Sequence, residues 1–116
     1  MSGCVLKASK ADFLARDFVA LHKIPCERVW EDAFNTSVSD CDGDDLAGQV
    51  ADAVTFLNTN AEMLPALTAL QVDVALDFGL WRAETFTQSV TFPAALVQMA
   101  GSLGVELGIS LYPLDP

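Results

Sequence analysis

The segment from Val90 to Pro113 limits the possible folds of this chain most strongly, because it contains a helix start, a helix stop and a change of period. Pro93 is suited to the start of a helix, where its missing N–H goes unused in any case. Gly104 is typical of the left-handed residue that ends a helix. Apolar and polar or small residues then alternate from Val105 to Leu111, as in a strand with one buried face. The predicted buried positions of the helix are Leu96, Met99, Ala100 and Leu103.

The rest of the chain also alternates between the periods of strands and helices. Period-two patterns predict strands at 3–9, 26–32, 34–40, 72–81 and 87–92, before the final strand. Helical spacing predicts helices at 10–23, 42–58 and 61–70. Ser9 is the expected N-cap of the first of these helices. We therefore expect one α+β domain over residues 1–116, with a single-layer, mostly antiparallel sheet of about six strands and three or four helices packed on one face.

Composition and charge exclude several classes of function. The chain has 116 residues, 52% of them hydrophobic, and a formal net charge of −10. A surface this acidic repels phosphate backbones and anionic lipids, so we expect neither nucleic-acid nor membrane binding. The opening residues lack the apolar run of a secretion signal, and no window reaches about 18 apolar residues, which predicts a cytoplasmic protein. Cys4, Cys26 and Cys41 have no paired spacing and are expected to be free thiols.

Acidic residues gather before the predicted helix at 42–58. The sequence DCDGDD supplies Asp40, Asp42, Asp44 and Asp45, and a nearby segment adds Glu31 and Asp32. Carboxylates in the first turn of a helix stabilise it, which is the structural explanation for Asp44 and Asp45. Tryptophan and arginine often anchor interfaces, so Trp30, Trp81 and Arg82 are added to the candidate partner-binding residues, although a buried strand-end tryptophan is an equally good reading of Trp81.

No metal, cofactor or catalytic residue is predicted. Asp40, Asp42 and Asp44 have the spacing of a calcium-binding EF-hand loop, but its glycine position is Asp45 and its final glutamate position is Ala51. His22 is the one histidine, and pairing with Cys26 or Asp17 would require a spatial contact that the sequence does not specify. We expect it to be a partly exposed residue at a helix end.

The second half of the chain resembles a family of small bacterial domains of unknown function. The resemblance lies in the segment DAVTFLNTNAEML and in a C-terminal pattern at Leu76, Asp77, Gly79, Phe92, Pro93, Leu96, Leu103, Gly104, Glu106, Ser110 and Tyr112. Some members occur beside toxin genes, so the resemblance implies an immunity role for part of the family. It supplies no catalytic residue, and the matched positions are expected to be structural.

Two functions remain open at this stage. The first is a non-catalytic protein that binds a basic partner, plausibly a toxin domain, through an acidic face. The second is a small enzyme or ligand-binding domain with a pocket between sheet and helices. The charge and the missing catalytic set favour the first, and the sequence predicts no oligomeric state.

Overall fold

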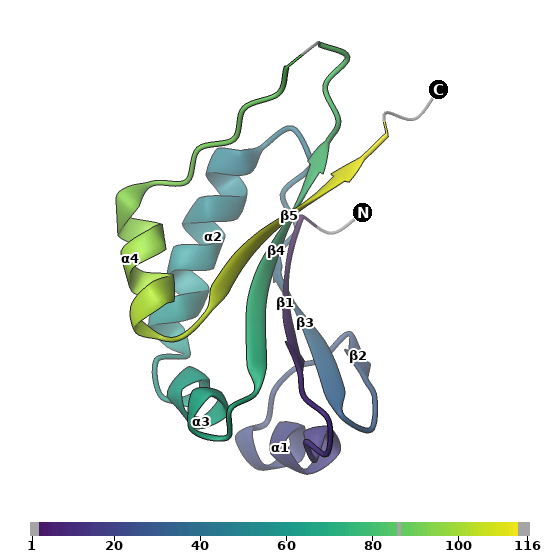
Figure 1. Ribbon diagram of the computed structural model, residues 1–116, viewed down its shortest axis with the longest axis vertical. Coiled ribbons are helices and arrows are strands. Elements are labelled where there is room, and N and C mark those ends of the chain that lie inside the picture. Colours follow the sequence, from purple (N-terminus) through teal and green to yellow (C-terminus); the bar gives the residue numbers. More distant parts are fainter. Residues whose placement is uncertain (1–2, 86, 114–116) are drawn as a thin grey trace.

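A computed structural model describes residues 3–85 and 87–113 of the chain. These residues form five strands and four helices (Figure 1). In chain order the elements are β1 (Cys4–Ser9), α1 (Ala15–His22), β2 (Arg28–Val29), β3 (Ala33–Ser39), α2 (Leu46–Thr59), α3 (Met63–Ala69), β4 (Asp73–Trp81), α4 (Ala94–Ser102) and β5 (Glu106–Tyr112). The α+β class is confirmed, with five strands where about six were expected.

The strands form one mixed sheet in the order β2-β3-β1-β4-β5. Three of the four neighbouring pairs are antiparallel, and β4 and β5 are parallel. A parallel pair needs a crossover connection, which here contains α4. Helices α2, α3 and α4 lie together on one side of the sheet, and α1 lies at the end where β1 finishes (Figure 1).

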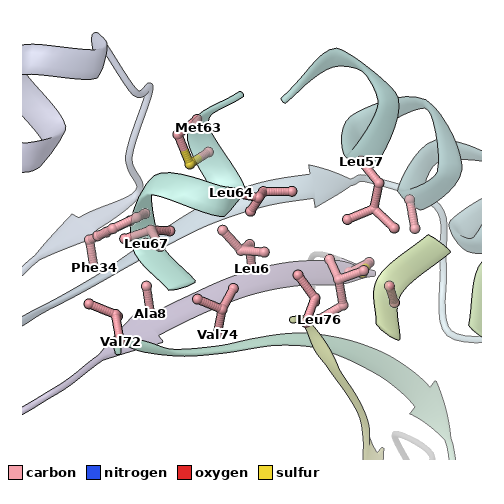
Figure 2. Close-up of a cluster of buried hydrophobic side chains, with 14 of the residues drawn as sticks. Leu6, Ala8, Phe34, Leu57, Met63, Leu64, Leu67, Val72, Val74 and Leu76 are labelled. Carbon is pink, nitrogen blue, oxygen red and sulfur yellow. The ribbon is translucent and has the colours of Figure 1, made fainter. Parts of the chain in front are cut away.

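The hydrophobic core lies between the sheet and these helices. Figure 2 shows Leu6 of β1 and Leu76 of β4 facing Leu57 of α2 and Leu64 of α3, and all four side chains are fully buried. The alternation predicted for residues 72–81 is therefore confirmed. Its apolar residues Val72, Val74, Leu76, Phe78 and Leu80 are buried.

The opposite face of the sheet carries mostly polar and small side chains, with Trp81 and Tyr112 at the ends of β4 and β5. At its centre, Lys7 Nζ lies 3.0 Å from Asp77 Oδ2. The Ser110 hydroxyl also contacts this carboxylate, 2.9 Å from Oδ1 and 2.8 Å from Oδ2. Asp77 and Ser110 are both part of the C-terminal pattern, and their contact joins β4 to β5.

The predicted strand at 87–92 is wrong, because these residues form no strand. They belong to the connection that returns the chain from the end of β4 to the start of α4 (Figure 1). The Gln88 side chain forms two hydrogen bonds to the main chain there. Its Nε2 donates to Trp81 O at 3.1 Å, and its Oε1 accepts from Ala83 N at 2.9 Å. Because residues 87–92 follow this connection without pairing with a strand, the sheet has five strands rather than six.

The predicted start of the first helix is also wrong. Ser9 is the last residue of β1 and caps no helix, and α1 begins only at Ala15. Lys10 N instead donates to Asp32 O at 3.2 Å, and Phe13 N closes a turn onto Lys10 O at 3.0 Å. Because residues 10–13 form these main-chain hydrogen bonds, α1 begins five residues later than predicted, at Ala15 rather than at Lys10.

Two glycines lie near the end of α4, and replacing each of them by alanine should have opposite effects on stability. Gly104 has a φ of +73°, and a Cβ there would lie 2.8 Å from Thr68 Oγ1. Gly104→Ala should therefore lower the free energy of unfolding by about 1–2 kcal/mol. Gly101 lies inside the helix with open space around its Cα. Gly101→Ala should raise stability by about 0.4–1 kcal/mol. Urea unfolding of both variants checks the prediction, and equal effects would contradict the left-handed stop.

Candidate functional site

The segment from Asp40 to Asp45, called here the acidic loop, connects β3 to α2. Asp45 is the N-cap of α2, and its Oδ1 accepts a hydrogen bond from Gly48 N at 2.9 Å. Asp44 and Asp45 were predicted in the first turn of a helix over 42–58, but they lie one to two residues ahead of α2, which begins only at Leu46. Asp45 therefore has a structural role as the helix cap. The side chains of Asp40, Asp44 and Asp45 are all exposed.

A buried glutamine fixes the acidic loop to the end of the sheet. Gln49 of α2 is fully buried, and its Nε2 donates to Asp42 O and to Gly79 O, each at 2.9 Å. Its Oε1 has no hydrogen-bond partner among the described residues. Gln49 was not among the residues predicted from the sequence. One signal in the sequence could have identified it. Gln49 is three positions after Leu46, so it is a polar residue on the apolar side of the predicted helix.

The same loop lies directly against Trp81. Trp81 N donates a hydrogen bond to Gly43 O at 3.1 Å. A Cβ built on Gly43 would lie 2.8 Å from both Trp81 N and Cδ1 of the indole ring, so this approach requires glycine. The structure thus brings four predicted carboxylates together with Trp81 and, one residue further, Arg82.

The carboxylates of the acidic loop keep their negative charge available to solvent. Asp40, Asp42, Asp44 and Asp45 are all exposed. In the described part of the chain, the recorded ion pair joins Lys7 and Asp77 on the open face of the sheet, and none involves the loop. Since no cation among the described residues forms an ion pair with these carboxylates, their negative charge is available to a partner.

A shallow polar hollow of about 640 Å³ adjoins the loop and is lined by Ser39, Cys41 and Asp52 among others. Ser39 Oγ donates to Asp52 Oδ2 at 2.6 Å, and Cys41 Sγ lies 3.5 Å from the same oxygen. The Ser39 hydroxyl lowers the pKa of the Cys41 thiol, but desolvation and the carboxylates of Asp52 and Asp45 outweigh it, and the pKa is raised. A thiol held protonated is a poor nucleophile, so this cluster does not favour catalysis.

The other predicted residues lie at the opposite end of β3. Trp30, Glu31 and Asp32 precede the start of β3, whereas the acidic loop follows its end. Seven strand residues separate the two groups by about 20 Å at roughly 3.3 Å per residue. The Arg28 guanidinium lies over the Trp30 ring at 5.2 Å, so Trp30 has a cationic neighbour of its own. The candidate residues therefore form two separate groups.

The possible catalytic residues of the sequence analysis take structural positions. The His22 ring stacks on Phe18 with centroids 4.2 Å apart. Burial raises the pKa of the Cys26 thiol, and burial together with Asp77 and Asp52 raises that of Cys4 to about 12. Within residues 3–85 and 87–113, no group of three or more His, Cys, Asp or Glu side chains is placed to hold a metal ion.

An apolar groove that the sequence did not predict lies beside α1. Its volume is about 580 Å³, and it is lined by the turn at 10–14, by α1 and by Leu70. Phe13 and Phe18 are buried there, whereas Leu14 and Leu21 are exposed. Leu21 is three residues after the buried Phe18, a spacing that is typical of one helix face, and yet it is exposed. The late start of α1 leaves only eight residues of helix, and Leu21 lies on its outer side.

No helix in the described ranges has both the length and the apolar composition needed to cross a membrane. Comparisons of the chain with models of protein families, with curated protein sequences and with solved structures give no match. The function is therefore inferred from the chain's own residues.

Proposed function

We propose that this chain is a non-catalytic, cytoplasmic protein-binding domain, which holds a basic protein partner against the acidic loop and Trp81. The observation that carries the proposal is the fixation of the loop. Gln49 and Trp81 bind its main chain at Asp42 and Gly43, while its carboxylates remain exposed and unpaired with any described cation. A binding surface that is already ordered loses less conformational entropy when the partner arrives.

The two parts of the surface would contribute differently to binding. The clustered carboxylates attract a basic partner over about 10 Å at ordinary ionic strength, which accelerates association. Trp81 is half-buried, so its indole has both a fixed position and accessible area. Aromatic side chains of this kind slow dissociation once water is excluded around them.

The more specific proposal is that the partner is a toxin domain and that the chain neutralises it as an immunity protein. Its support is the C-terminal resemblance, together with the acidic surface. A toxin domain that acted on a nucleic acid would need a basic surface for the phosphates, and the acidic loop would compete for that surface. The pKa values of all three thiols are raised, which disfavours a thiolate nucleophile in this chain.

Differential capture tests where the partner binds. The chain is used as bait in a lysate of the organism that encodes it, in three forms: wild type, Asp40→Lys with Asp44→Lys, and Glu31→Lys with Asp32→Lys. Both double variants change the net charge by the same amount, and none of the four side chains makes a recorded hydrogen bond. We expect a basic protein to bind the wild type and the 31/32 variant and to be lost from the 40/44 variant.

Equal capture by all three baits, or equal loss from both variants, would contradict binding at the acidic loop. Loss from the 31/32 variant alone would move the site to the Trp30 end of β3. Unchanged circular dichroism and melting temperature of each bait establish that lost capture is not lost folding.

The groove beside α1 favours a second candidate function, the binding of an apolar ligand. Its buried Phe13 and Phe18 and its volume of about 580 Å³ are within the range of small-molecule sites. An apolar fluorescent probe should bind there, and Leu21→Asp should weaken that binding at least tenfold, since it introduces a charge into the groove. Binding that is unaffected by Leu21→Asp would exclude this groove.

A further inference from the structure

The outer edge of β5 has none of the usual protection against pairing with another strand. β5 is an edge strand of seven residues with the sequence ELGISLY, which contains one charge and neither lysine nor proline. The opposite edge, β2, has two residues and begins with Arg28. Natural proteins commonly keep edge strands short or charged, because their free main-chain groups pair readily with another strand. The edge of β5 therefore requires an explanation.

The orientation of the main chain identifies which residues face outward. In a parallel strand, both main-chain groups of a residue point to the same side, and successive residues alternate. Tyr112 O accepts a hydrogen bond from Arg82 N at 2.7 Å, so Tyr112 points toward the side of β4. By alternation, Leu107, Ile109 and Leu111 direct their N–H and C=O groups away from the sheet.

The side chains of the same region are apolar and exposed. Ile109 is 41% exposed and Leu111 is 50% exposed, although both were expected to be buried on the face of the final strand. Val97 on the neighbouring helix α4 is also 50% exposed. Between Thr85 and Pro113 the sequence has a single charged residue, Glu106, in a chain of net charge −10. This is the surface on which the chain's own charges oppose self-association least.

We propose that a second copy of this chain pairs with β5 in an antiparallel arrangement centred on Ile109, which joins the two sheets of a symmetric dimer. Such two-fold pairing places Ile109 opposite Ile109 and Leu107 opposite Leu111, so the three outward-facing residues of each strand meet one another. Gly108 lies opposite Ser110, and Glu106 lies opposite Tyr112. All outward main-chain groups from Leu107 to Leu111 are then paired.

Charge favours a second copy over the basic partner of the acidic loop at this edge. The register centred on Ile109 keeps the two Glu106 side chains six residues apart along the strands, about 20 Å, which is beyond the screening length of roughly 10 Å. A basic protein would find one carboxylate on this surface and four on the acidic loop. The β5 sequence is apolar and pairs with itself in this register, so a second copy of the chain fits this edge better than a basic protein does.

Sedimentation velocity and oxidative cross-linking test the dimer. At about 100 µM the wild type should sediment as a dimer and dissociate on dilution, since assembly depends on concentration. Ile109→Lys places two ammonium groups at the two-fold axis and should make the chain monomeric. Leu21→Lys, which changes an apolar residue that is even more exposed and lies on α1, should leave the dimer intact.

Cross-linking tests the register in a Cys26→Ser, Cys41→Ser background. Ile109→Cys should form an intermolecular disulfide, because hydrogen-bonded antiparallel partners have Cα atoms about 5.5 Å apart. Leu111→Cys should not, because its copy would lie four residues away, at about 13 Å. A wild type that stays monomeric at about 100 µM, a dimer that survives Ile109→Lys, or faster cross-linking through Leu111→Cys would overturn the proposal.

Discussion

Leu96→Ala is expected to lower the free energy of unfolding by about 2–5 kcal/mol. Leu96 is fully buried on the inner side of α4, where this helix packs against α2 and β5. Alanine removes the transfer energy of the leucine side chain and leaves a cavity that the surrounding core cannot fill. Urea unfolding followed by circular dichroism measures the loss.

The next residue of the same helix provides the control. Val97 is 50% exposed, so Val97→Ala should cost less than about 0.5 kcal/mol. Helix propensity slightly favours alanine at this position, which reduces the loss further. Similar losses for the two variants would show that α4 is rotated relative to its described orientation.

Gln49→Met is expected to lower the free energy of unfolding by about 1–3 kcal/mol, although methionine has nearly the volume of glutamine. The variant removes both 2.9 Å bonds. Asp42 O keeps a hydrogen bond from Asp45 N at 3.0 Å, so Gly79 O is the carbonyl that loses its donor. Each buried polar group that loses its partner costs about 1–3 kcal/mol. Denaturant unfolding gives the total, and hydrogen exchange should show faster opening of the acidic loop.

Gln98 supplies a matched control on another helix. Its side chain is exposed on α4, so Gln98→Met should change stability by less than about 0.5 kcal/mol. If Gln49→Met were equally mild, and exchange in residues 40–45 unchanged, Gln49 would not hold the loop. The preorganisation invoked for partner binding would then lose its physical basis.

Local signals made the C-terminal half of the fold predictable. Pro93 and Gly104 act within one turn of the chain, so their sequence positions suffice to place the ends of α4. The alternation from Val72 to Leu80 reports burial directly, because strand side chains have a period of two. The strand predicted at 87–92 failed because a period of two is a local pattern, and these residues form part of the crossover from β4 to β5 without pairing with a strand.

The candidate site was only partly predictable, because its contacts join residues distant in sequence. The acidic loop is visible as DCDGDD, but the contact between Gly43 and Trp81 spans 38 positions and depends on the end of β4. Glu31 and Asp32 are near in sequence and yet lie at the other end of β3. Burial of Ile109 and Leu111 also failed as a prediction, since period two identifies a face of a strand and not what covers it.

Binding kinetics with the captured partner test the central claim most directly. Association is measured at low and at moderate salt for the wild type and for the Asp40→Lys, Asp44→Lys variant, with Trp81→Ala as a third form. Steering by the acidic loop predicts that wild-type association slows as salt rises and that the double variant associates about tenfold more slowly at low salt. Trp81→Ala should mainly raise the dissociation rate. Association that is independent of salt and unchanged by the double variant would contradict binding at the acidic loop.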